Sequence, residues 1–184
     1  MKCYTSGKDF TFKEVEKEFQ TDAGCEMNLI KAYPKITYQE ILGMGGALTE
    51  SAAYTYAQMS TEKQKELLDL YFGKNGNRYN FGRVHIQSCD FALGNYAYVE
   101  DETDKELKTF SIARDKEYIL PLIHAAKEQE EELTLLAPPW SPPAFMKTNG
   151  EMNHGGKLKK EYYGMWADMV ARYVTEYKKQ GVNI

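Results

Sequence analysis

The alternation of apolar runs with helix-like segments constrains this chain more than any single motif. Three times the sequence passes from a short apolar run, through a polar loop rich in aromatic residues, to a segment with helical periodicity. This alternation predicts an α/β fold, a sheet or barrel of parallel strands joined by helices. The three units begin near residues 43, 79 and 133, and residues 182–184 have the pattern of a fourth strand at its start.

The length of the chain and the apolar pattern of its N-terminal residues limit the possible domain organisation. A closed barrel of eight β/α units takes about 250 residues, and this chain has 184, so we expect only part of one. Residues 36–38 alternate apolar and polar behind Pro34, which predicts a strand outside the repeated unit. Residues 22–24 break the stretch before it. We interpret residues 1–42 as a flanking N-terminal β segment and residues 43–184 as the β/α part.

Strands and helices are predicted from local patterns. Three glycines near residues 43–48 permit close backbone approach or positive φ at strand one. Strand two is predicted at 79–87, and strand three at 133–137, a continuous apolar run typical of buried parallel strands. The clearest helical periodicity spans residues 162–177, and Gly181 is predicted to end that helix.

Capping residues mark the other two helices. Ser60 is predicted to cap the first. Asp115 is predicted to cap the second, in which Pro121 requires either a kink or a later start.

Composition excludes several classes of protein. The net charge is −4, and acidic and basic residues are interspersed, so no basic stripe for a nucleic-acid partner is expected. Cys3, Cys25 and Cys89 are spaced neither as a disulfide framework nor as metal ligands. No apolar run is long enough to span a membrane, and none follows the N-terminus as in a secretory signal. We expect free thiols, a cytoplasmic location, and no cofactor or metal.

The loops after the strands supply the candidate site residues, because ligands of parallel β/α folds bind there. This rule selects Glu50, Asp90 and Trp140 after strands one, two and three. The Asp90 carboxylate can accept two sugar hydroxyls, the Trp140 ring can pack on a pyranose, and Phe91 can wall the same pocket. Spacing alone equally allows Asp90 to cap its own loop and Trp140 to lie in the core.

Arg83 and His85 fall on the same face of strand two. Because arginine is seldom buried unless it is paired, Arg83 implies a carboxylate partner pointing into a barrel; the alternative is an arginine that reaches solvent at a strand edge. A lone strand histidine such as His85 is more often a satisfied core residue than a ligand. His124 and His154 have no partners at useful spacing and are given no role.

Three separated motifs carry a resemblance to a known family. They are residues 43–51, residues 79–98 (Tyr-Asn-Phe-Gly-Arg-Val-His-Ile, then Ser-Cys-Asp-Phe-Ala-Leu-Gly-Asn-Tyr) and residues 140–150 (Trp-Ser-Pro-Pro-Ala-Phe-Met-Lys-Thr-Asn-Gly). In unbroken order over residues 36–184, the chain resembles the N-terminal part of glycoside hydrolase family 30, within it the glucosylceramidase and β-glucosidase branch. The resemblance implies a partial (β/α)8 TIM barrel, with three β/α units and the start of strand four, beside an accessory β-sandwich.

The resemblance also implies a reaction, the retaining hydrolysis of a β-glycoside by two glutamates whose carboxyl groups lie about 5–5.5 Å apart. By resemblance, Asp90 holds sugar hydroxyls, Trp140 stacks in the same subsite and Phe91 lines it, while Arg83 supports the nucleophile. Both catalytic glutamates are expected beyond Ile184, the acid/base in an Asn-Glu-Pro loop after strand four.

Two residues qualify this picture. Glu50 matches the acidic residue after strand one and replaces neither catalytic glutamate. Pro138 stands where the resemblance predicts serine, and a second proline would stiffen the Trp140 loop.

The sequence therefore predicts the N-terminal part of a retaining β-glucosidase or glucosylceramidase-like hydrolase, inactive by itself, with β-glucosides such as glucosylceramide as substrates. The alternatives are a β-1,6-glucanase or β-xylosidase of the same family, a non-catalytic sugar-binding remnant, or half of a split enzyme that needs a complementing C-terminal chain. Because strands would be missing, we also expect Val84, Leu135, Trp166 and Tyr173 to lack part of their burial.

Overall fold

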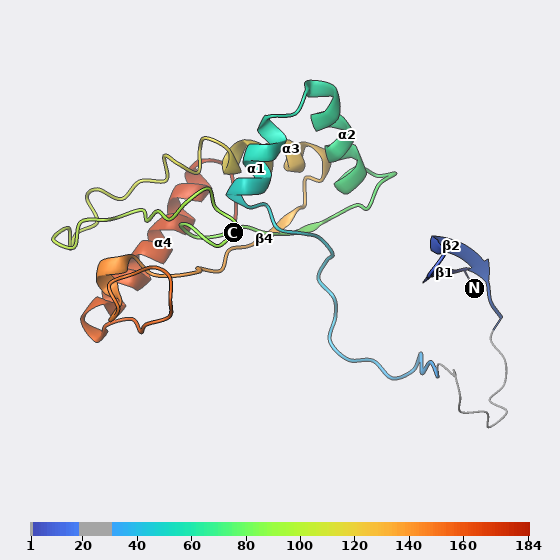
Figure 1. Ribbon diagram of the computed structural model, residues 1–184, viewed down its shortest axis with the longest axis horizontal. Helices are drawn as coiled ribbons and strands as arrows, with labels where there is room; N and C mark the ends of the chain where they lie inside the picture. Colours follow the sequence, from blue (N-terminus) through green and yellow to red (C-terminus); the bar gives the residue numbers. More distant parts are fainter. Residues whose placement is uncertain (1, 19–30) are drawn as a thin grey trace. The chain divides into compact units, whose positions relative to one another are not determined.

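The computed structural model describes residues 2–18 and 31–184. The chain divides into two compact units, Met1–Glu40 and Ile41–Ile184, and each is described by itself (Figure 1). The break predicted at residues 22–24 and the Cys25 thiol lie outside the described residues. Cys3 and Cys89 are free cysteines, and burial raises the pKa of the Cys89 thiol.

The first unit contains an antiparallel hairpin of β1 (Lys2–Gly7) and β2 (Phe10–Glu16). Tyr4 lies opposite Glu14, and its hydroxyl donates to the Glu14 carboxylate at 2.8 Å. The β structure of the N-terminal segment is therefore a local hairpin that the sequence patterns did not predict.

The prediction of a strand at residues 36–38 is wrong. These residues adopt no regular structure, and Tyr38 is 86% exposed. An alternating pattern forms a stable strand only when a neighbouring strand pairs with its backbone and covers one face. No strand within the described residues pairs with this segment.

The second unit is built on parallel strand segments in chain order. β3 (Phe81–Arg83) pairs in parallel with β4 (Thr134–Leu136), and Gly82 lies opposite Leu135. On the other edge of β3, Ala47 of strand one forms a parallel bridge to Arg83. Because helices fill the crossovers, this is the predicted start of a β/α barrel.

The regular strands are shorter than the predicted runs, although pairing continues past them. The Val84 N–H donates to the Leu136 carbonyl oxygen at 2.9 Å, and Ile86 forms a parallel bridge to Pro139. Residues 182–184 form no regular strand. A Cβ added to Gly45 would lie 1.5 Å from the Phe81 carbonyl oxygen, so close backbone approach explains this glycine of strand one.

In residues 41–184, all of which are described, the strand segments are followed by the α-helices α1 (Glu50–Ala57), α2 (Thr61–Tyr71), α3 (Ile119–Gln129) and α4 (Tyr163–Lys179). Short 3₁₀ turns lie at Ala144–Met146 and Lys160–Tyr162. Both α1 and α2 pack against α3 (Figure 1). In residues 2–18 and 31–184, no helix has the length and apolar character that crossing a bilayer requires.

The helix ends test the capping predictions. Ser60 caps α2, since its Oγ accepts the Lys63 N–H at 3.4 Å, and Gly181 follows α4 with a φ of 77°; both predictions are confirmed. The later start of α3 is also confirmed, and Pro121 lies in its first turn, where the missing N–H is tolerated. Helix α1 was not predicted; Thr49 caps it by accepting the Ala52 N–H at 3.3 Å.

The two faces of the short sheet differ in burial. Val84 and Leu135 face the helices and are only 1% and 6% exposed, whereas Leu136 on the opposite face is 52% exposed. Tyr173 is fully buried and Trp166 packs partly buried against the core. The expectation that Val84, Leu135 and Tyr173 lack burial is therefore wrong, because the helices present already cover that face.

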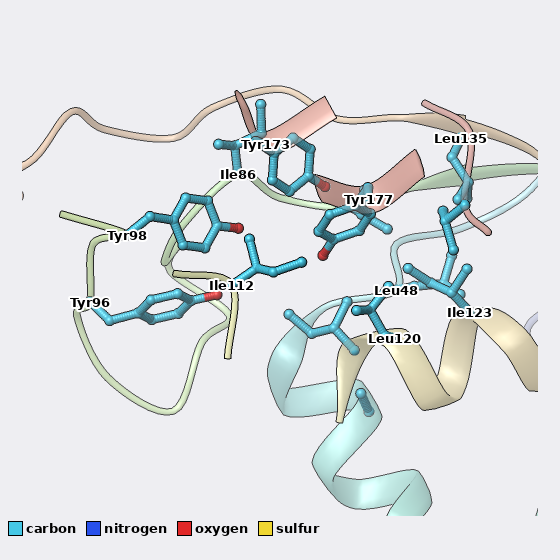
Figure 2. Packing of buried hydrophobic residues seen from close by; sticks show 14 of the residues in the cluster. Leu48, Ile86, Tyr96, Tyr98, Ile112, Leu120, Ile123, Leu135, Tyr173 and Tyr177 are labelled. Atoms are coloured by element: carbon cyan, nitrogen blue, oxygen red, sulfur yellow. The ribbon is translucent and has the colours of Figure 1, made fainter. Parts of the chain in front are cut away.

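Tyrosines fill much of the core between the sheet and α4. Figure 2 shows Tyr96 and Tyr98, from the connection after β3, extending toward Tyr173 and Tyr177 of α4. The rings of Tyr98 and Tyr173 stack with their centroids 5.8 Å apart. This packing fixes α4 against the loop that follows β3.

Candidate functional site

A cavity of about 270 Å³ lies at the carboxyl ends of strand one and β3. Arg83, Asp90 and Phe91 line it, together with Ala47, Thr49, Val84, His85 and Cys89. Asp90 is exposed and Phe91 is 63% exposed, so both are accessible to a solute. The structure thus brings together three of the four residues to which the resemblance assigns a role in the site, and Trp140 is the fourth.

Arg83 and His85 both line this cavity, as does Val84 between them. His85 is buried and both ring nitrogens are bonded: Nε2 accepts the Glu50 N–H at 3.1 Å, and Nδ1 donates to the Gln87 carbonyl oxygen. The interpretation of His85 as a satisfied core residue is confirmed. Arg83 is exposed, and no carboxylate of residues 2–18 or 31–184 forms an ion pair with it.

Glu50 lies beneath the site as the first residue of α1 and is 1% exposed. The Arg114 guanidinium donates to its two carboxylate oxygens at 2.6 and 3.1 Å, and the Leu93 N–H donates to it at 2.7 Å. Burial alone would raise the pKa of Glu50, but these hydrogen bonds and the guanidinium charge hold that pKa below its usual value. Glu50 therefore anchors the loop that carries Asp90 and Phe91.

Asp115 has a different role from the predicted helix cap. It is fully buried, and the hydroxyls of Tyr96, Tyr98 and Tyr177 donate to its carboxylate at 3.0, 2.6 and 2.8 Å. Helix α3 begins four residues later, without a side-chain cap. The cap prediction is wrong because tyrosines distant in sequence compete for the carboxylate that local pattern assigned to a helix end.

The loop after β4 places Trp140 beside the same edge of the sheet. The Ile86 N–H donates to the Pro138 carbonyl oxygen at 3.4 Å, so the extra proline lies within the pairing that leads to Trp140. Trp140 is 38% exposed, and it is not among the residues that line the cavity around Asp90. A proline is compatible with this position because only its carbonyl group takes part in the pairing.

The residues that line the cavity are suited to binding a ligand. Asp90 is the one carboxylate that lines it, whereas retaining glycoside hydrolysis needs two carboxyl groups about 5–5.5 Å apart. Within the described ranges, no cluster of three or more His, Cys, Asp or Glu side chains could hold a metal ion. An exposed carboxylate beside an aromatic ring and a guanidinium is suited to a polyhydroxylated ligand.

Sequence reasoning did not identify Arg114 or Gln87 as parts of this site. Arg114 bonds a glutamate 64 positions away, and Gln87 bonds a carbonyl group 54 positions away. Neither residue belongs to a local motif, so a single sequence carries no signal for these contacts.

Comparison with known proteins places this geometry in a family. Residues 41–184 match the sequence model of the glycosyl hydrolase family 30 TIM-barrel domain. The chain is 36% identical over 160 residues to the lysosomal acid glucosylceramidase of Mus musculus; the match covers 84% of this chain and 31% of the mouse protein.

Solved structures of other proteins share the fold. The crystal structure of SrfJ from Salmonella typhimurium matches with a TM-score of 0.82 and 41% identity, over 94% of this chain and 39% of SrfJ. An endo-β1,6-glucanase matches with a TM-score of 0.73 and 25% identity, over 83% of this chain and 35% of that protein. The chain thus spans less than half the length of each of these relatives.

Proposed function

This chain belongs to glycosyl hydrolase family 30, and we propose that it supplies the sugar-holding side of a retaining β-glycosidase site. The cavity formed by Arg83, Asp90 and Phe91 is the observation that carries this proposal. It lies at the carboxyl ends of parallel strands, where β/α enzymes bind their substrates. It also combines a hydroxyl acceptor with an apolar wall, which is the chemistry that a pyranose requires.

In the proposed site, Asp90 accepts hydrogen bonds from two sugar hydroxyls and Phe91 walls the subsite next to the scissile bond. Trp140, on the neighbouring loop, packs against the C–H face of the sugar. Arg83 is exposed in the cavity, and it orients a nucleophilic carboxylate. We place that carboxylate and the acid/base on polypeptide outside residues 1–184, either in the same protein or in a complementing chain.

We propose a β-glucoside as the substrate, with glucosylceramide as one candidate. The name of the mouse relative, a glucosylceramidase at 36% identity, supports this choice. A β-1,6-linked glucan is the second candidate, because an endo-β1,6-glucanase shares the fold at 25% identity. Both substrates present a β-linked glucosyl unit to the Asp90 cavity and differ in the group that leaves.

A fusion of residues 1–184 to the remaining C-terminal part of SrfJ tests the proposal. SrfJ is suitable because it covers 94% of this chain at 41% identity. We expect the fusion to hydrolyse an aryl β-glucoside and the isolated chain to show no turnover above background. Parallel assays with an aryl β-xyloside and a β-1,6-linked glucan rank the substrates.

Two variants of the fusion make the test specific to the site. Asp90→Ala is expected to abolish most turnover, whereas Asp168→Ala, an exposed aspartate on α4, serves as the matched control. Turnover that survives Asp90→Ala in a folded fusion would contradict the proposed sugar contact. Turnover by the isolated chain that follows the protein through repurification would contradict the placement of the catalytic carboxylates. Activity restored by a separate C-terminal fragment would favour the split enzyme.

A further inference from the structure

A buried glutamine joins the two loops that carry the proposed sugar contacts. Gln87 is fully buried where the chain leaves the pairing between β3 and β4. Its Nε2 donates to the Ser141 carbonyl oxygen at 2.9 Å, and its Oε1 accepts the Tyr98 N–H at 3.2 Å. One side chain therefore uses its donor on the loop after β4 and its acceptor on the loop after β3.

The bond to Tyr98 closes the base of the loop that holds Asp90 and Phe91. Beside it, the Ser88 N–H donates to the Tyr96 carbonyl oxygen at 3.2 Å. These two hydrogen bonds tie together the two ends of the loop that carries Asp90 and Phe91. Asp90 is three positions from Gln87, so only Ser88 and Cys89 separate the two residues in the chain.

The bond to Ser141 fixes the residue that follows Trp140. Ser141 is itself held from the other side, because its Oγ donates to the Met152 carbonyl oxygen at 2.7 Å. The buried Lys147 donates to that Oγ at 3.1 Å and to the same carbonyl oxygen at 2.8 Å. Trp140 thus emerges from a backbone whose position is defined by Gln87 on one side and by this polar cluster on the other.

The backbone of Gln87 is also unusual. Its φ is 63°, a left-handed conformation that costs free energy in a residue other than glycine. Such a conformation persists when the surroundings determine it, and it is found at functional sites more often than elsewhere. Here the Gln87 carbonyl oxygen accepts a hydrogen bond from His85, and the Gln87 side chain is held by its bonds to Ser141 and Tyr98.

We propose that Gln87 is a positioning residue that couples the Trp140 loop to the Asp90 loop, so that the two sugar contacts keep a fixed separation. The coupling itself follows from the hydrogen bonds of this chain. Its consequence for catalysis rests on the proposed function, in which Asp90 and Trp140 contact the sugar.

The first experiment measures the coupling without a sugar. The chain has two tryptophans, so Trp166→Phe leaves Trp140 as a single fluorescent reporter. Gln87→Met keeps the side-chain length and removes both hydrogen bonds, and Gln129→Ala, exposed on α3, is the matched control. We expect Gln87→Met to raise acrylamide quenching of Trp140 about twofold, because a released loop samples open states more often. The control should leave quenching unchanged.

A second variant separates the two hydrogen bonds. An ionised glutamate at position 87 can accept from Tyr98 but cannot donate to Ser141, whereas a protonated one can do both. Gln87→Glu should therefore show increased quenching at neutral pH that returns toward the unsubstituted value in acid. His85, Lys147 and Asp115 also face this region, so the unsubstituted chain is measured at every pH as the reference. Gln87→Met should show no such recovery.

The third experiment measures the consequence in the active fusion. Gln87→Met is expected to lower kcat/KM for an aryl β-glucoside about tenfold. In a Trp140→Ala background the same substitution should have little further effect, because no ring remains to be positioned. Far-UV circular dichroism checks folding, and Gln87→Gly, which relieves the left-handed strain, replaces Gln87→Met if that variant does not fold.

The outcomes distinguish this inference from the proposed function. If Asp90→Ala impairs turnover while folded Gln87→Met changes neither quenching nor kcat/KM, the positioning role of Gln87 is wrong and the function stands. If quenching changes but kcat/KM does not, Gln87 couples the two loops, but its proposed role in positioning the sugar contacts is wrong. If Asp90→Ala is also without effect, the proposed function fails instead.

Discussion

Asp115 offers the strongest single perturbation of the core that supports the site. Its fully buried carboxylate accepts from Tyr96 and Tyr98, in the connection after β3, and from Tyr177 on α4. Asp115→Ala removes the acceptor and leaves three hydroxyls in a space that water does not reach. The loop beneath Asp90 and helix α4 lose their shared contact in the same step.

The magnitude follows from the opposing contributions. A buried hydroxyl left without a partner costs about 1–3 kcal/mol, so three would cost about 3–9 kcal/mol together. Removing a buried carboxylate also removes its desolvation penalty, which is several kcal/mol. We therefore expect Asp115→Ala to lower the free energy of unfolding by about 3 kcal/mol, and Asp115→Asn, which keeps one acceptor oxygen, to lower it by about 1 kcal/mol.

Urea unfolding of the SrfJ fusion, followed by circular dichroism, measures these changes, because the isolated chain is expected to unfold without a sharp transition. Two tyrosines of α4 provide a matched pair: Tyr177→Phe deletes a hydroxyl bonded to Asp115, whereas the Tyr173 hydroxyl has no hydrogen-bond partner among the described residues. We expect Tyr177→Phe to cost about 1 kcal/mol and Tyr173→Phe to be neutral or stabilising. Equal losses for the two variants, or no loss for Asp115→Ala, would refute the hydrogen-bond network as the source of stability.

The pH dependence of stability tests the direction of the Asp115 pKa shift independently. Burial raises the pKa of Asp115, and the hydrogen bonds from Tyr98, Tyr177 and Tyr96 lower that pKa only in part. The folded chain therefore binds a proton more tightly at Asp115 than the unfolded chain does. Its stability relative to Asp115→Asn should fall as pH rises from about 4, the pKa of an unfolded aspartate, through the raised pKa of the folded state. A relative stability that rises over this window would show that the sign is wrong.

Three further predictions concern the site and the chain. In the SrfJ fusion, Asp90→Ala should lower kcat/KM, with a loss of about 2–4 kcal/mol in transition-state stabilisation. Unchanged kinetics in a folded variant would show that Asp90 only caps its own loop. Glu50→Ala should lower the free energy of unfolding by about 2–3 kcal/mol in urea at neutral pH, because Arg114 and the Leu93 N–H lose their acceptor. Since the pKa of Glu50 is lowered in the folded chain, this loss should shrink as pH falls below about 4. In thermal unfolding with sedimentation, the isolated chain should unfold broadly and associate, because an apolar hollow of about 580 Å³ beside α1 and α2 and the face bearing Leu136 are uncovered; a sharp transition of a clean monomer would contradict this.

Local patterns predicted the elements whose signals are local. The cap at Ser60, the periodicity of α4 and the order of the strands depend on residues within one or two turns or within one apolar run. The predicted strand at 36–38 failed because pairing, which a single strand cannot supply, decides whether an alternating pattern becomes a strand.

Sequence position selected residues that line the cavity but not the contacts of the buried residues around it. Asp90 was selected because it follows a strand, and Phe91 because it is the next residue and could wall the same pocket. Asp115 was assigned to a helix end because the competing partner Tyr177 is 62 positions away. The position of Glu50 was predicted but its ion pair with Arg114 was not, because no spacing rule relates residues 64 positions apart.

The buried residues whose contacts sequence reasoning missed are those that connect the loops. Glu50 links the start of α1 to the loop after β3 through Leu93, and Gln87 links that loop to the one after β4. Asp115 ties the same connection to α4 through Tyr177. The regular strands beneath are only three residues long, so backbone pairing holds the loops over a short distance. The relative positions of the proposed sugar contacts therefore depend on these side chains, and substitutions among them should alter the site before they abolish the fold.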